Sequence, residues 1–271
     1  MDAGGPSDVW ARGDAYERYM GRWSRRVAQL FLARLGAPAA LRWLDVGCGT
    51  GALTSQVASR CRPRTVLGLD RSGEFVRAAR AAAPVPARFA VADASALPLC
   101  DAVFDAVVSG LALNFVEPPE AAVAEAARVV RPGGLVAAYV WDYADGMALL
   151  RLFWDAAAAV DPAAAALDEG RRFPLCRPDP LRALWTGAGL TDVTVGSVEV
   201  PTVFTGLEDL WEPFLSGQGP APGYVATLAP AARDRLRTRL AATLPAGPGG
   251  SVRLTARAWT VRGRRPPGPP Q

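Results

Sequence analysis

The chain has 271 residues with a formal net charge of +4, and half of its residues are hydrophobic. This length and composition suit one large domain with a sizeable core. Because the sequence contains no histidine and no lysine, it excludes a Ser-His-Asp triad, a Cys-His dyad, a histidine-ligated metal centre and a Schiff-base lysine.

The four cysteines, Cys48, Cys61, Cys100 and Cys176, form no C-x-x-C pair and lack the spacing of zinc ligands. They indicate reduced thiols in a cytoplasmic protein without a bound metal. No apolar run approaches the roughly 18–20 residues that span a bilayer, and the N-terminus lacks the apolar core of a signal peptide. The arginines are scattered among carboxylates, which disfavours a nucleic-acid partner.

The first part of the chain alternates between helical and extended patterns. A helical pattern of apolar residues runs from Trp10 to Leu35. Short apolar strands then alternate with helices as far as Trp141, which predicts an α/β fold whose doubly wound parallel sheet has helices on both faces. The strands are predicted at 41–47, 65–70, 87–93, 103–110 and 135–141, and the helices at 51–59, 72–82 and 118–130.

After Asp142 this alternation lapses, and only two further strands are predicted, at 191–200 and 251–263. They bring the sheet to seven strands. We expect the extra helices of this region to lie over the carboxyl edge of the sheet, where open parallel sheets bind ligands. These helices are predicted at 147–160, 178–190, 207–215 and 224–240.

One domain is predicted over residues 1–265, followed by a disordered tail at 266–271. Within the domain, residues 1–40 form an N-terminal helical lid and residues 41–142 form the cofactor-binding core. The inserted helices form a substrate cap, made by residues 143–180 and 201–248.

The stretch LDVGCGTGALT (44–54) places glycines at alternate positions directly after the first strand. Such a turn at the start of a helix is typical of sites for nucleotide-like ligands. The spacing Gly47-x-Gly49-x-x-Ala52, with Asp70 about 20 residues further on, also satisfies a loose dinucleotide fingerprint. A nicotinamide-dependent dehydrogenase is therefore one interpretation of this turn taken alone.

The glycine turn is the first of five segments that occur together in a characteristic order. Taken as a set, they resemble the class I S-adenosylmethionine-dependent methyltransferases, most closely the subgroup with ubiquinone and menaquinone C-methyltransferases and many small-molecule methyltransferases. This resemblance covers about residues 41–142 and implies a Rossmann-like fold. The five segments are LDVGCGTG, GLDRS, VADASALPL, FDAVVSGLALNFV and EAARVVRPGGLVAAYVW.

The resemblance implies that S-adenosyl-L-methionine is the cofactor and assigns roles to particular residues. Its methionine portion would lie against the backbone of Gly47, Gly49 and Gly51, and Asp45 would meet its ammonium group. Cys48 lies inside the same motif, and we interpret its side chain as a small group that packs in the protein interior. The remaining assignments are Asp70 to the ribose hydroxyls, Arg71, Asp93 and Ala94 to adenine, and Ser109 and Gly110 to the neighbourhood of the transferred methyl group.

The implied reaction is the in-line displacement of the sulfonium methyl by an O-, N- or C-nucleophile, which releases S-adenosylhomocysteine. A general base is needed only for a poor nucleophile, and without histidine it would be a carboxylate or a tyrosine. The candidates at the carboxyl edge of the sheet are Tyr16, Tyr19, Glu117, Asp142 and Tyr143.

The apolar and aromatic character of the cap segments favours a small-molecule methyl acceptor, and the protein is expected to be a monomer or a homodimer. Two alternatives stay open. A nucleic-acid or protein methyltransferase would need a basic stripe beside the site, and NFVEPP (114–119) only faintly resembles a motif of enzymes that methylate nucleic-acid amino groups. A non-catalytic cofactor-binding protein could share the same fold.

Overall fold

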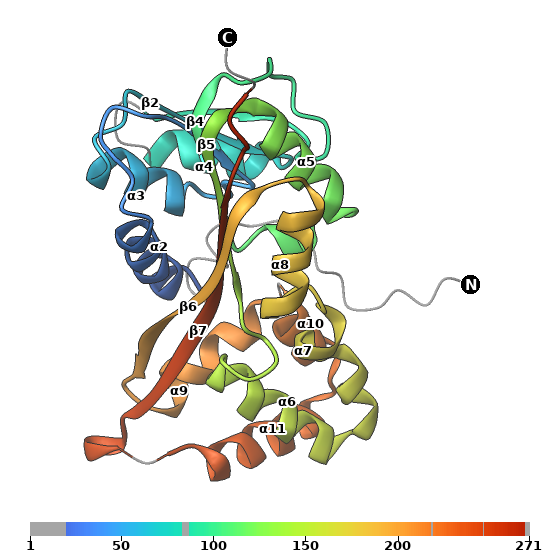
Figure 1. The fold of residues 1–271 in the computed structure, drawn as a ribbon. Helices are drawn as coiled ribbons and strands as arrows, with labels where there is room; N and C mark the ends of the chain where they lie inside the picture. The colour runs from blue at the N-terminus through green and yellow to red at the C-terminus, as the bar shows by residue number, and fades with distance from the viewer. Residues whose placement is uncertain (1–19, 83–86, 218, 246, 269–271) are drawn as a thin grey trace. The chain divides into compact units, whose positions relative to one another are not determined.

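The computed structural model describes residues 20–82, 87–217, 219–245 and 247–268 (Figure 1). These residues divide into two compact units. Unit one comprises the described residues within 20–23, 142–174 and 199–257, and unit two those within 24–141, 175–198 and 258–268.

A seven-stranded sheet is the framework of the fold, in the order β3-β2-β1-β4-β5-β7-β6. The first five strands pair in parallel, and β7 runs antiparallel to β5. This confirms the predicted mostly parallel, doubly wound sheet. The strands are β1 (Arg42–Val46), β2 (Thr65–Asp70), β3 (Ala87–Val91), β4 (Phe104–Gly110), β5 (Val130–Trp141), β6 (Thr191–Phe204) and β7 (Val252–Arg264).

The strand order reverses between β1 and β4. From β1 the chain proceeds outward to β2 and β3, and it then returns to place β4 on the other side of β1. In open parallel sheets, the loops that leave such neighbouring strands diverge, and a crevice opens at their carboxyl ends. The fold therefore fixes where a ligand site is expected before any side chain is considered.

Helices cover both faces of the sheet in unit two, and Figure 1 shows α2 and α3 on one side of the strands and α5 and α8 on the other. Phe31 of α2 packs on Tyr139 of β5 with ring centroids 4.7 Å apart. Trp185 of α8 donates its ring N–H to the Val136 carbonyl of β5 at 3.1 Å. The helices are α2 (Arg22–Leu35), α3 (Ala52–Arg60), α4 (Gly73–Ala82), α5 (Pro119–Val129) and α8 (Pro178–Gly187), with a short 3-10 turn η2 (Leu113–Phe115).

Unit one is mainly helical and has an aromatic core. Phe153 and Phe214 stack with ring centroids 4.5 Å apart, and Trp154 and Tyr224 complete the cluster. Its elements are α6 (Ala148–Val160), α7 (Glu169–Arg172), α9 (Leu207–Trp211), α10 (Pro220–Thr227), α11 (Pro230–Thr243) and the 3-10 turns η3 (Pro162–Leu167), η4 (Glu212–Ser216) and η5 (Pro248–Gly250).

Several predicted elements differ from the structure. The helix expected at 207–215 is α9 followed by the 3-10 turn η4, and η3 and α7 were not predicted. The single helix expected at 224–240 is two helices, because Pro230 has no N–H for a continuing helix and instead occupies the first turn of α11. The strand expected from residue 135 begins at Val130, with a register irregularity opposite Phe104 and Ala106. The strand expected to end at residue 200 continues to Phe204.

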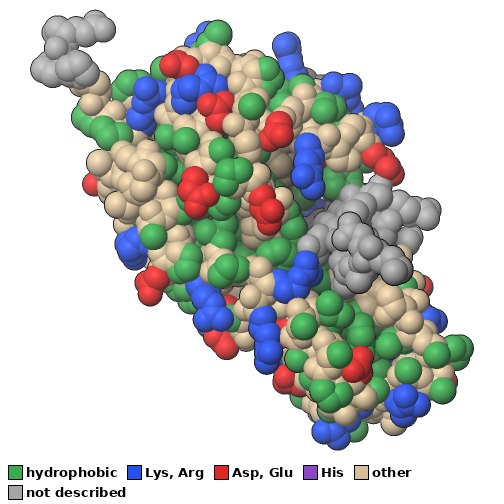
Figure 2. Space-filling model, turned by 90° about the vertical axis from the view of Figure 1, so that its right-hand side faces the viewer, with side chains coloured by type: hydrophobic (Ala, Val, Ile, Leu, Met, Phe, Trp, Pro, Cys, Tyr) green, Lys and Arg blue, Asp and Glu red, His purple; other side chains and the backbone are tan. Residues whose placement is uncertain are grey.

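Charged side chains of both signs are interspersed on the molecular face shown in Figure 2, with hydrophobic side chains between them. This face carries no single-sign stripe of the kind that binds a nucleic-acid backbone. Among the described helices, none combines the length and the apolar character that crossing a membrane requires.

Candidate functional site

The glycine turn lies at the reversal point of the sheet, between the end of β1 and the start of α3. The backbone N–H groups of Gly47 and Cys48 both donate to the Leu69 carbonyl of β2, at 2.8 and 2.9 Å. The Gly51 N–H donates to the Cys48 carbonyl at 2.9 Å. These bonds hold the turn against the neighbouring strand.

The three glycines of the turn all have positive φ angles, of 73°, 53° and 88° in chain order. Residues other than glycine rarely adopt such a backbone conformation. The three glycines differ in what surrounds them. A Cβ atom at Gly47 would stand 2.4 Å from the Ala112 Cβ, and one at Gly51 would stand 3.3 Å from the Phe89 ring. Among the described residues, nothing lies within 4 Å of a Cβ placed at Gly49. Protein packing therefore adds a reason for glycine at positions 47 and 51, and of the three glycines only Gly49 borders space that the described residues leave open.

Asp45 is fully buried at the end of β1. Its Oδ2 accepts a hydrogen bond from the Thr54 hydroxyl at 2.6 Å. Its Oδ1 is buried and has no hydrogen-bond partner among the described residues. Burial raises the pKa of this carboxyl to about 7, and the negative charge of Asp70 adds to the shift; the Thr54 hydroxyl and, more weakly, the Thr54 backbone N–H oppose it. A buried acceptor without a donor is costly, so Oδ1 marks a position where a hydrogen-bond donor or a cation would be stabilised.

Asp70 ends β2 and is half-buried. Its Oδ2 accepts from the Gly49 N–H at 2.9 Å, and its Oδ1 accepts from the Ser72 N–H at 2.8 Å. Asp70 thus links the glycine turn to the start of α4. Because each carboxylate oxygen has two lone pairs, both oxygens keep capacity to accept from a ligand hydroxyl.

Cys48 points into the protein core and is 6% exposed, in a cluster with Val76, Ala79 and Phe89. Burial, together with the charges of Asp45 and Asp70, raises the pKa of its thiol far above the usual range. A protonated, buried thiol is a poor nucleophile. The structure therefore supports the interpretation of Cys48 as packing within the motif.

Two further predicted ligand residues follow β3. Asp93 is exposed, and its Oδ1 accepts from the Ser95 N–H at 2.8 Å, which shapes the loop. Ala94 lines the pocket described below. Arg71, which follows Asp70, is exposed.

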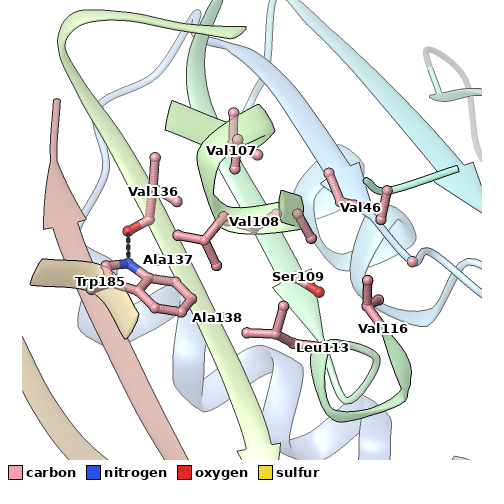
Figure 3. A pocket seen from close by; sticks show the side chains of 15 residues that line it. Val46, Val107, Val108, Ser109, Leu113, Val116, Val136, Ala137, Ala138 and Trp185 are labelled. Atoms are coloured by element: carbon pink, nitrogen blue, oxygen red, sulfur yellow. Dashed lines mark hydrogen bonds between the residues drawn. The ribbon is translucent and has the colours of Figure 1, made fainter. Parts of the chain in front are cut away.

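A mostly apolar pocket lies between α5 and the sheet in unit two (Figure 3). Gly47, Ala94 and Ser109 border it, so the pocket brings together three residues that the sequence assigned to cofactor binding. Trp185 and its hydrogen bond to Val136 lie at the β5 side (Figure 3). The other lining residues are Val46, Val107, Val108, Leu113, Val116, Ala122, Val123, Ala126, Val136, Ala137 and Ala138.

Gly110 ends β4 and lies against Tyr139 of β5. A Cβ at Gly110 would stand 2.5 Å from the Tyr139 hydroxyl oxygen, so contact with this ring is a reason for glycine there. The predicted proximity of Gly110 to the methyl group stays a prediction.

The general-base candidates have varied environments. Tyr16 and Tyr19 lie outside the described residues. Asp142 is buried in unit one and forms an ion pair with Arg257, whose guanidinium lies 2.6 Å from Oδ2. Tyr143 is buried, with its ring centroid 5.5 Å from that of Phe173. These contacts give both residues a packing role within unit one, and a role in proton transfer stays a prediction.

Sequence reasoning missed two polar groups near the site. Thr54 is fully buried and bonded to Asp45; the sequence shows it only as one residue of a helix. Asn114, in η2, has both carboxamide atoms buried without a hydrogen-bond partner among the described residues. A polar residue in the apolar segment LALNFV is the signal that could have singled out Asn114.

Comparison with known proteins gives a methyltransferase domain match over residues 44–138. The malonyl-[acyl-carrier protein] O-methyltransferase of Geobacter sulfurreducens is 39% identical over 126 residues, which are 46% of this chain and 46% of that protein. The matches to the first curated relatives span 28 to 51% of their lengths, so the chain spans about half or less of the relatives it matches.

Solved structures extend the likeness of the fold over most of the chain. Phosphoethanolamine N-methyltransferase 2 of Haemonchus contortus, crystallised with S-adenosyl-L-methionine, superposes with a TM-score of 0.59 at 18% identity, covering 96% of this chain and 57% of that chain. The [4+2]-cyclase SpnF superposes with a TM-score of 0.53 at 19% identity, covering 90% and 81%. These likenesses confirm the predicted Rossmann-like α/β fold.

Proposed function

We propose that this chain, whose residues 44–138 match a methyltransferase domain, is a class I enzyme that transfers the methyl group of S-adenosyl-L-methionine to a small-molecule acceptor. The transfer is an in-line displacement at the methyl carbon and releases S-adenosylhomocysteine. The single observation that carries the proposal is the buried, unpartnered Oδ1 of Asp45 beside a turn whose Gly49 borders open space.

The residues present fit the methionine end of this cofactor. Its ammonium group supplies the cation that Asp45 Oδ1 lacks, and the open space at Gly49 allows backbone approach. A hydrogen bond to a charged group is stronger than one between neutral groups. Asp45 therefore binds the ammonium group in this proposal, and Gly49 leaves room for the rest of the methionine portion.

The ribose and adenine portions are assigned to the loops that follow β2 and β3. Asp70 accepts from the ribose hydroxyls with the lone pairs that its bonds to Gly49 and Ser72 leave unused. Asp93 accepts from the adenine amino group, the backbone N–H of Ala94 donates to the ring, and Arg71 flanks it. Exposure of Asp93 and Arg71 leaves both side chains accessible to a ligand.

When bound, S-adenosylmethionine supplies an electrophilic methyl group, so the protein chiefly aligns the reactants and excludes water. Relatives named for O-methylation of a malonyl group and N-methylation of phosphoethanolamine show that domains like this one serve different acceptor atoms. An acceptor with an ionised oxygen needs no general base, which suits a chain without histidine.

Two other functions stay as alternatives. A nucleic-acid or protein methyltransferase would keep the cofactor site and change the acceptor. A non-catalytic cofactor-binding protein on the same fold is the second. We favour methyl transfer because the glycine turn and both carboxylates, Asp45 and Asp70, are in place. We also expect a cytoplasmic protein that is a monomer or a homodimer, which fractionation and gel filtration would test.

Methyl-labelled S-adenosylmethionine tests the proposal directly. The purified protein is incubated with extract from its own host, and small molecules, nucleic acids and proteins are then separated. We expect label in the small-molecule fraction and none with Asp70→Ala. Label in a polymer fraction would overturn the acceptor class, and measurable cofactor binding without transfer of label would favour the non-catalytic alternative.

A further inference from the structure

We propose that Thr54 is a positioning residue for the cofactor: its hydroxyl holds the Asp45 carboxylate by one oxygen and leaves the other oxygen free for the ammonium group. The inference rests on the proposed function, since it concerns the same cofactor site.

The contact joins the first turn of α3 to the end of β1. The Thr54 hydroxyl donates to Asp45 Oδ2 at 2.6 Å, and both side chains are fully buried. A threonine hydroxyl has one hydrogen to donate, so it satisfies Oδ2 and cannot also satisfy Oδ1. Oδ2 is therefore occupied by the hydroxyl, while Oδ1 has no hydrogen-bond partner among the described residues, although the Thr54 backbone N–H lies close enough to lower the pKa of the carboxyl slightly.

The neighbouring strand leaves room for this hydroxyl. A Cβ atom at Gly68 of β2 would stand 2.9 Å from the Thr54 hydroxyl oxygen and 2.7 Å from the Phe89 ring. A side chain at residue 68 would therefore displace the hydroxyl or the ring. The position of Thr54 is fixed by three elements at once, β1, β2 and α3.

The hydroxyl also favours the charged form of Asp45. Burial and the negative charge of Asp70 both raise the pKa of Asp45, and the hydrogen bond from Thr54 is the largest influence that lowers it. The other titratable neighbour is the Cys48 thiol, whose own pKa the Asp45 charge helps to raise. No arginine among the described residues is paired with Asp45, so Thr54 is the group that helps it ionise and meet a cation.

Two substitutions and two ligands test the inference. Thr54→Val keeps the shape and removes the hydroxyl, whereas Thr54→Ser keeps the hydroxyl. S-adenosylhomocysteine carries the ammonium group, and 5′-methylthioadenosine lacks the amino-acid portion. We expect Thr54→Val to weaken S-adenosylhomocysteine about tenfold, to leave 5′-methylthioadenosine within about twofold, and to move the midpoint of the pH-dependent affinity upward. Thr54→Ser should restore wild-type values.

A double-mutant cycle with Asp45→Asn provides a second readout. With the carboxylate gone, Thr54→Val should no longer change the affinity for S-adenosylhomocysteine. Equal weakening of both ligands by Thr54→Val, or unchanged affinity for S-adenosylhomocysteine, would overturn the inference. If Thr54→Val does not fold, Thr54→Cys is compared with Thr54→Ser instead, because a thiol is a weaker hydrogen-bond donor than a hydroxyl. Equal affinities of these two variants for S-adenosylhomocysteine would also overturn the inference. Failure of the wild-type protein to bind S-adenosylhomocysteine would instead contradict the proposed function.

Discussion

Asp45 in unit two and Glu169 in unit one are both buried carboxyl groups whose pKa burial raises to about 7. Their surroundings differ. Glu169 accepts a hydrogen bond from the Trp154 ring N–H and lies near two opposite charges: Asp168 raises its pKa and Arg151 lowers it. Asp45 has a bare oxygen, and the charged neighbour that shifts its pKa is another carboxylate, Asp70.

This difference indicates how a buried carboxyl group that binds a ligand can be told from one that stabilises the fold. Burial and a raised pKa occur in both, so neither property alone identifies a site. A like charge also lies near each of them, Asp70 near Asp45 and Asp168 near Glu169. The buried oxygen without a hydrogen-bond partner among the described residues is what distinguishes Asp45. By this criterion we propose that Glu169 stabilises unit one and that Asp45 binds a cation.

The largest effect is expected from Asp70→Ala. This change removes the acceptor that anchors the Gly49 N–H and the proposed acceptor for both ribose hydroxyls. We expect the affinity for S-adenosylhomocysteine to fall by about 100-fold or more, with little change in thermal unfolding. Titration calorimetry measures the affinity, and Glu120→Ala, an exposed change of equal charge on α5, is the control. Unchanged affinity would sink the site assignment.

Asp45→Asn tests whether the Asp45 carboxylate contributes to ligand binding. We expect it to weaken S-adenosylhomocysteine by about 10- to 100-fold, because a charged hydrogen bond to the ammonium group is lost. The free energy of unfolding should stay the same or rise, since a carboxyl group repelled by Asp70 is removed. A large loss of stability in denaturant titrations, with unchanged affinity, would assign Asp45 to the fold.

Glu169→Leu should give the opposite pattern. It leaves the buried Trp154 ring N–H without an acceptor, which destabilises a protein by about 1–3 kcal/mol. The affinity for S-adenosylhomocysteine should not change. Glu169→Gln keeps an acceptor oxygen and is the matched control, so it should lose less stability. Weakened ligand binding by a folded Glu169→Leu protein would contradict the distinction between the two carboxyl groups.

The pH dependence separates the same two residues. Between the ordinary Asp pKa of 3.8 and the native value of about 7, the ligand-free native state binds more protons at Asp45 than the unfolded chain does. The contribution of Asp45 to the free energy of unfolding therefore falls as the pH rises through this range and is level above it. Glu169 contributes the same trend between 4.5 and about 7.

The affinity for S-adenosylhomocysteine distinguishes them. Its amino group stays protonated over this range and binds the ionised form of Asp45, so we expect the affinity to rise with pH up to about 7 and then to level off. Asp45→Asn should flatten this rise, whereas Glu169→Gln should preserve it. A rise that persists in Asp45→Asn would assign the titration to another group.

The sequence was sufficient to predict the strands of the sheet, because an apolar run bounded by turns is a local pattern. It also located the glycine turn and the carboxylates Asp45 and Asp70. It could not reveal that Ala112 and Phe89 are further reasons for glycine at 47 and 51, since both contacts join distant parts of the chain. The bond from Thr54 to Asp45 was invisible for a related reason: it depends on how α3 packs on β1.

Titration calorimetry of the wild-type protein with S-adenosylhomocysteine and, in parallel, with NAD tests the central claim most directly. The account predicts one site for S-adenosylhomocysteine, no binding of NAD, and loss of the S-adenosylhomocysteine signal in Asp70→Ala. Binding of NAD instead, or of neither ligand by the folded protein, would contradict it.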